Sequence, residues 1–169
     1  MEQYVNQLLN MSTRIGVLML QSGAEIYRVE DSVHRIHMAY CAGESQVYCV
    51  PTTVIATVSL PGGENATRCV RVTGQKTNLS RMMALSDQCR RICLLKPDYD
   101  TVNREIDRIL EMPVYTPWQT CLAWALVSMG FTMLFGGGFA EAALSLIPAV
   151  LVAMLSFPLA RLQVNVYFN

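Results

Sequence analysis

The sequence predicts an α+β domain followed by an all-α transmembrane helical hairpin, and three observations support this fold class. Nearly all charged side chains precede Pro113, whereas Glu141 and Arg161 are the charged residues after it. Two long uncharged runs follow Pro113, and the region before it alternates between helical and strand-like apolar spacing. We therefore expect a cytoplasmic domain at residues 1–112, with helices packed on a small antiparallel hairpin or sheet, and transmembrane helices at residues 113–169.

Composition narrows the range of partners. The 169 residues are 52% hydrophobic, and 13 Lys and Arg residues balance 13 Asp and Glu residues. This balance leaves no basic surface for nucleic acid phosphates, so we expect no nucleic-acid binding. The N-terminus lacks the basic start and apolar run of a secretory signal, which predicts that the first domain stays in the cytoplasm. The six cysteines include no Cys-x-x-Cys pair, so we expect free thiols, no metal site and no cofactor.

Helical spacing dominates the first forty residues. Apolar side chains recur every three or four positions from Val5 to Met19, which predicts a first helix. Ser22 and Glu25 have the spacing of a capping box, a motif worth on the order of 1 kcal/mol, and we expect this box to open a second helix. That helix is predicted to continue to Tyr40 on an apolar stripe and to end before Gly43.

Strand-like alternation follows. The segment from residue 47 to residue 60 is rich in β-branched side chains, which predicts one or two strands bent at Pro51. Turn residues at 61–65 precede a second alternating segment at 68–72, so we expect a hairpin. A hairpin alone buries too little surface, so we expect the helices to cover it. The sequence leaves room for an additional strand, from this chain or from a partner.

Two more helices complete the predicted first domain. Asn78 is a suitable N-cap for a third helix, which Pro97 stops. Cys89 and Cys93 lie one turn apart in this helix, and we interpret them as small core residues rather than as a soft-metal pair. A fourth helix is expected after an Asp98 or Asp100 cap, with an apolar stripe ending at Ile109.

The uncharged runs after Pro113 predict the hairpin. Residues 118–135 reach roughly 27 Å as a helix at about 1.5 Å per residue, close to the hydrocarbon thickness of a bilayer. A second run occupies residues 142–160, and residues 162–169 read as the start of a third span. The connection has no basic residue, so both ends of the hairpin are placed in the cytoplasm. The alternative is a pair of buried helices in a soluble protein.

The run from Ser22 to Val33, followed by Arg35 and Ile36, resembles the signature of the N-terminal domain of the threonine/serine exporter family. Further matching segments occur in the family's order: Thr67-Arg68 with Arg71-Val72, Asn78-Leu79, and Phe135-Gly136-Gly137. The resemblance implies a multi-pass exporter of threonine and serine, or of succinate, in the inner membrane, with a cytoplasmic N-terminal domain. It also implies contact with membrane lipid, and a homo-oligomer, a separate small membrane subunit, or both.

No catalytic set can be argued from the spacing, and we predict substrate-binding or gating residues instead. They are Ser22, Gly23, Glu25, Tyr27, Arg28, Glu30, Asp31, Arg35 and Glu141. The helix N-terminus at Ser22, Gly23 and Glu25 is either an anion site or only a cap.

The charged members of this set suit a solute with a carboxylate. Arg28 and Arg35 have the chemistry to clamp a carboxylate, while Glu30 or Asp31 can hold an ammonium group. The simpler alternative is an ordinary Asp31–Arg35 pair. Glu141 is a candidate gate or proton-coupling residue, or merely a solvated one.

Three functional hypotheses follow from the sequence. The first is an exporter component for a small carboxylate-bearing solute. The second is a membrane-tethered enzyme of hydrolase type, which the sequence does not favour because no nucleophile and base can be paired by spacing. The third is an adaptor domain that transports nothing. His34 and His37 are interpreted as members of a solvated helix face.

Overall fold

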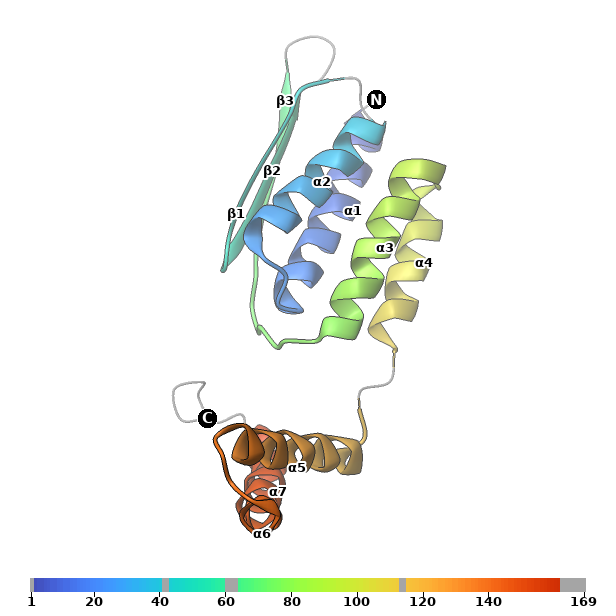
Figure 1. The fold of residues 1–169 in the computed structure, drawn as a ribbon. Helices are drawn as coiled ribbons and strands as arrows, with labels where there is room; N and C mark the ends of the chain where they lie inside the picture. The colour runs from blue at the N-terminus through green and yellow to red at the C-terminus, as the bar shows by residue number, and fades with distance from the viewer. Residues whose placement is uncertain (1, 41–42, 60–63, 113–114, 162–169) are drawn as a thin grey trace. The chain divides into compact units, whose positions relative to one another are not determined.

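The computed structural model describes residues 2–40, 43–59, 64–112 and 115–161. The chain divides into two compact units, Met1–Met112 and Pro113–Asn169. Each unit has its own secondary structure (Figure 1). The segment that was expected to begin a third span, 162–169, lies outside the described residues.

The first unit stacks a sheet and two layers of helices. Helices α1 (Glu2–Gln21) and α2 (Ile26–Tyr40) lie against one face of the sheet, and α3 (Leu79–Leu95) and α4 (Tyr99–Leu110) pack on the other side of these two helices (Figure 1). The amphipathic spacing of α2 explains its place, because Val29, Val33 and Ile36 are fully buried.

The sheet is an antiparallel meander with strand order β1-β2-β3. Its strands are β1 (Ser45–Val50), β2 (Thr53–Ser59) and β3 (Asn65–Arg71). The register places Val47 opposite Ala56 and Cys49 opposite Val54. Alternate residues of β2 are buried, which is the period expected of a strand with one covered face.

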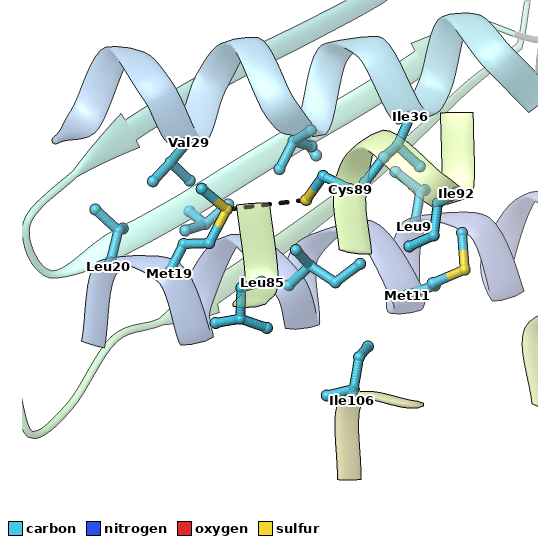
Figure 2. Close-up of a cluster of buried hydrophobic side chains, with 14 of the residues drawn as sticks. Leu9, Met11, Met19, Leu20, Val29, Ile36, Leu85, Cys89, Ile92 and Ile106 are labelled. Atoms are coloured by element: carbon cyan, nitrogen blue, oxygen red, sulfur yellow. Dashed lines mark hydrogen bonds between the residues drawn. The ribbon is translucent and has the colours of Figure 1, made fainter. Parts of the chain in front are cut away.

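Apolar side chains from the helices and the sheet form one core in the first unit. Figure 2 shows Met19 of α1 beside Cys89 of α3, with their sulfur atoms 4.0 Å apart. Burial raises the pKa of Cys89 to about 12. The interpretation of Cys89 as a core residue is therefore confirmed, whereas Cys93 is only half-buried.

Local capping signals confirm two predicted helix starts. The Asn78 side chain accepts a hydrogen bond from the backbone N–H of Arg81 at 3.0 Å, and Asp98 accepts one from Thr101 N–H at 3.1 Å. The bend predicted at Pro51 is the tight turn that separates β1 from β2. The sheet therefore has one strand more than a two-stranded hairpin.

The second unit corrects the predicted fold class. It contains α5 (Pro117–Leu134), α6 (Phe139–Leu144) and α7 (Leu146–Arg161). No helix in the parts of the chain that the structure describes is both long enough and apolar enough to cross a membrane. The predicted transmembrane hairpin, with spans at 118–135 and 142–160, is therefore wrong.

The error has a physical reason, because an uncharged run is not necessarily an apolar helix. The first turn of α5 contains Trp118, Gln119 and Thr120, whose polar groups lower the hydropathy of the helix. The second run is divided between α6 and α7 at Ser145, whose hydroxyl donates to the carbonyl of Ala142 at 2.7 Å.

Candidate functional site

A hollow of about 460 Å³ lies between α2 and α3. From α2 it is lined by Arg28, Asp31, Ser32 and Arg35, and from α3 by Ser86, Cys89, Arg90, Cys93 and Leu94. We call this site the arginine hollow. Its α2 residues follow a spacing of three and four, so they share one stripe of the helix while the apolar stripe enters the core.

Positive charge prevails in the arginine hollow, where the arginines are Arg28, Arg35 and Arg90 and the carboxylate is that of Asp31. Arg35 Nε donates to Asp31 Oδ2 at 2.8 Å, which raises the pKa of Arg35. The arginine and aspartate side chains of this pair are 70% and 53% exposed, so the pair adds little to stability. The predicted ordinary Asp31–Arg35 pairing is therefore present.

The other two arginines of the hollow are held loosely or not at all. Arg90 Nη1 lies 3.6 Å from Asp87 Oδ1, in an exposed ion pair. The Arg28 guanidinium forms no hydrogen bond or ion pair with any residue that the structure describes. Planar guanidinium groups with free donors match the geometry of a carboxylate, so the hollow has the chemistry to bind one.

The flank of α2 that faces β1 is different. Glu30 Oε1 accepts a hydrogen bond from the backbone N–H of Cys49 at 2.8 Å, which ties α2 to the edge of the sheet. Tyr27, Glu30, Asp31 and His34 line an open hollow of about 760 Å³ on this side. The neighbouring Glu25 raises the pKa of Tyr27, mainly through a hydrogen bond.

The predicted capping box at the start of α2 is not formed. The Ser22 hydroxyl donates to the carbonyl of Leu18 at 2.7 Å, so it completes the end of α1. Gly23 has a φ of 89° and closes the turn, and a Cβ there would lie 3.3 Å from Thr77 Oγ1. Backbone N–H groups of α2 bond to the carbonyl of Glu25, so α2 begins after that residue.

The predicted substrate-binding or gating residues therefore lie in separate parts of the structure. Arg28, Asp31 and Arg35 meet in the arginine hollow, while Glu30 and Tyr27 face the β1 side. Ser22 is buried in the turn, where its hydroxyl is already bonded. Glu141 lies in the second unit, exposed in the first turn of α6.

Sequence reasoning missed the contribution of α3. Ser86, Arg90 and Cys93 occur at helical spacing, so they form a polar stripe beside the buried stripe of Leu85, Cys89 and Ile92. That spacing is visible in the sequence. What the sequence does not reveal is that this stripe faces Arg28, because the packing of α2 on α3 is a long-range contact.

The interpretation of His37 as part of a solvated face is wrong. Its side chain is fully buried, with Nε2 2.7 Å from Ser12 Oγ and Nδ1 2.7 Å from Ser45 Oγ. Because Ser12 donates to the carbonyl of Leu9, the consistent arrangement has Nε2–H donating to Ser12 and Ser45 donating to Nδ1. Burial lowers the pKa of His37 to about 4, with a smaller effect from His34.

Comparison with families of known proteins gives a match over most of the chain. A family model described as a putative threonine/serine exporter matches residues 10–169. No curated protein and no solved structure matches the chain.

Proposed function

The chain belongs to the threonine/serine exporter family, and from that premise we propose that it is a component of an exporter of small carboxylate-bearing solutes. In this proposal the first unit gathers or gates the solute, whose carboxylate binds in the arginine hollow. The solute is threonine or serine, or alternatively succinate. The observation that carries the proposal is the guanidinium of Arg28, which has no hydrogen-bond or ion-pair partner among the described residues and lines the hollow with Arg35 and Arg90.

The arrangement suits both solute types in different ways. A hydroxy amino acid would place its carboxylate at Arg28 and Arg90 and its ammonium group at Asp31. Succinate would place both of its carboxylates against arginines and would have no use for Asp31. The role of Asp31 therefore separates the two substrates.

Location and partners form part of the same proposal. We place the chain at the inner membrane, with the first unit on the cytoplasmic side. None of the residues described in α5 is buried, and Trp118, Leu126 and Phe131 of this helix are all exposed. Apolar surface of this extent favours contact with membrane lipid, with other copies of the chain, or with a separate membrane subunit.

We propose binding and gating rather than chemical conversion of the solute. A buried His37 between two serines has the composition of a catalytic pair, but its side chain is 0% exposed. Both ring nitrogens are occupied by hydrogen bonds that join α1, α2 and β1. The arrangement supports a structural role for this histidine.

Efflux measurements test the proposal. Cells that carry the complete export system are preloaded with labelled threonine, serine or succinate, and release is compared for the wild type, Arg28→Ala and Asp31→Ala. Arg91→Ala is the matched control, because Arg91 is an exposed arginine of α3 that does not line the hollow.

We expect Arg28→Ala to abolish efflux of the native solute at normal membrane abundance, and Arg91→Ala to leave it unchanged. Loss of efflux in Asp31→Ala would identify an amino acid as the solute, whereas retained efflux would identify the dicarboxylate. Unchanged efflux of all three compounds in Arg28→Ala would refute the assignment of the site.

A further inference from the structure

A second hollow, of about 500 Å³, lies at the far end of α2 from Arg28. It forms where the start of α1, the end of α2 and the loop between α3 and α4 meet, and it shares no lining residue with the arginine hollow. Its walls include Tyr4, Leu8, Met11, Tyr40 and Tyr99, with Lys96 among the loop residues. This volume and this mainly apolar, aromatic lining are typical of small-molecule sites.

Two of the three tyrosines that line this tyrosine hollow are held by hydrogen bonds of their hydroxyl groups. The Tyr40 hydroxyl donates to the carbonyl of Pro97 at 2.6 Å, and the Tyr4 hydroxyl donates to the carbonyl of Tyr40 at 3.3 Å. Burial raises the pKa of Tyr40 to about 12, so its hydroxyl remains a donor at neutral pH. Rings held in this way favour a flat partner, because less side-chain freedom is lost on binding.

Lys96 and Asp98 give the tyrosine hollow one charged side chain of each sign, and the two differ in their partners. The Asp98 carboxylate is already committed, since its two oxygens accept from the N–H and the hydroxyl of Thr101. The Lys96 ammonium is exposed and has no hydrogen-bond or ion-pair partner among the residues described. The Lys96 ammonium is therefore available to pair with a ligand carboxylate beside apolar and aromatic surface, whereas the Asp98 oxygens already accept hydrogen bonds from Thr101.

The backbone at Lys96 supplies an independent observation. Lys96 is the C-cap of α3, with φ 46° and ψ 52°, and it is the one non-glycine residue with positive φ in the described chain. Glycine is the usual residue in this left-handed conformation, because it has no Cβ to clash. A lysine kept in a strained conformation in the lining of a hollow points to a use for its side chain.

We propose that the tyrosine hollow is a second binding site, which takes a small aromatic carboxylate. The ring of the ligand packs among the tyrosine side chains, and its carboxylate pairs with the Lys96 ammonium. This site is separate from the solute site of the proposed exporter function and does not depend on it.

The chain contains only two lysines, Lys76 and Lys96, which makes the test internally controlled. Both are exposed, and only Lys96 lines the hollow. The full-length chain in detergent is treated with an amine-acylating reagent, with and without benzoate, and mass spectrometry gives the acylation rate of each lysine. Benzoate at about ten times its Kd should slow acylation of Lys96 about tenfold, because the site is then mostly occupied, and should leave Lys76 unaffected.

Two further probes separate the parts of the proposal. Acetate carries the same charge without the ring, and benzyl alcohol carries the ring without the charge, so each should protect Lys96 less than benzoate does. Equal protection by acetate would overturn the aromatic part of the proposal. Equal slowing of both lysines, or of neither, would overturn the site itself.

A substitution checks the same site without labelling. Lys96→Gly removes the cation and suits the left-handed backbone, so this variant should fold at least as well as the wild type. Its affinity for benzoate, measured by calorimetry, should fall about tenfold, while Lys76→Gly should bind normally. Normal benzoate binding by a folded Lys96→Gly chain would contradict the assigned role of the lysine.

Discussion

The two flanks of α2 contain polar residues of similar types but use them in opposite ways. Toward β1, Glu30 bonds to the N–H of Cys49 and His37 bonds to Ser45, so the polar groups join the helix to the sheet. Toward α3, Arg28 has no partner in the described chain, and the Arg35–Asp31 pair is open to solvent. Polar groups that form hydrogen bonds within the protein stabilise this fold, whereas polar groups without such partners are available to bind a solute.

The largest expected effect is a loss of stability at low pH, which we attribute to His37 on the flank of α2 toward β1. The pKa of His37 is about 4 in the folded chain and 6.5 when unperturbed, so the unfolded chain binds a proton first as pH falls. Stability should therefore be fully present above pH 6.5 and fall by roughly 3 kcal/mol as pH drops toward 4. Urea unfolding of the full-length chain at a series of pH values measures this loss.

His37→Gln is the control for this prediction. Glutamine keeps a donor and an acceptor but does not titrate, so the pH dependence between 6.5 and 4 should become shallower. An equal slope in the variant would show that other groups cause the loss of stability.

A smaller effect on stability is expected at Glu30. Replacing it with alanine leaves the Cys49 N–H without the carboxylate that it bonds in the native fold. A hydrogen bond to a charged group is worth about 2 kcal/mol, so the free energy of unfolding of Glu30→Ala should fall by about that amount. Glu25→Ala, at an exposed position, is the control and should change stability by less than about 0.5 kcal/mol. Equal losses of stability in Glu30→Ala and Glu25→Ala would contradict the proposed difference between the two flanks of α2.

The smallest stability effect is expected on the flank toward α3. Asp31→Ala removes an exposed ion pair, which contributes about 0 to 1 kcal/mol in typical proteins. Thermal unfolding of this variant should therefore resemble that of the wild type, even where solute efflux changes. A loss as large as that of Glu30→Ala would show that Asp31 is structural and would weaken its proposed contact with an ammonium group.

Local signals made much of the first unit predictable from sequence. Asn78 and Asp98 act on residues three positions away, and the stripe of Val29, Val33 and Ile36 repeats within one helix. The capping box is absent for a local reason that spacing does not show, because the Ser22 hydroxyl donates to the carbonyl of Leu18 in α1. Periodicity predicts which face of a helix is buried, but it does not predict every side-chain partner.

Long-range partners explain the other differences. His37 looked solvated because its neighbours in sequence are polar, yet its serine partners come from α1 and β1. Arg90 joins the candidate site only because α3 packs on α2. In the second unit, the sequence predicts that the uncharged runs span a membrane, but charge is only one component of hydropathy. The polar start of α5 lowers the hydropathy of the first run, and the break at Ser145 divides the second run into two shorter helices.

Direct solute binding by the full-length chain tests the central claim, that the arginine hollow recognises a carboxylate. Threonine, serine and succinate are titrated by calorimetry into the wild type, Arg28→Gln and the control Arg91→Gln in detergent. We predict that Arg28→Gln weakens binding of the native solute by at least about tenfold, or about 1.4 kcal/mol, while Arg91→Gln binds as the wild type does. Equal affinity of the wild type and Arg28→Gln for a solute that binds would contradict the account.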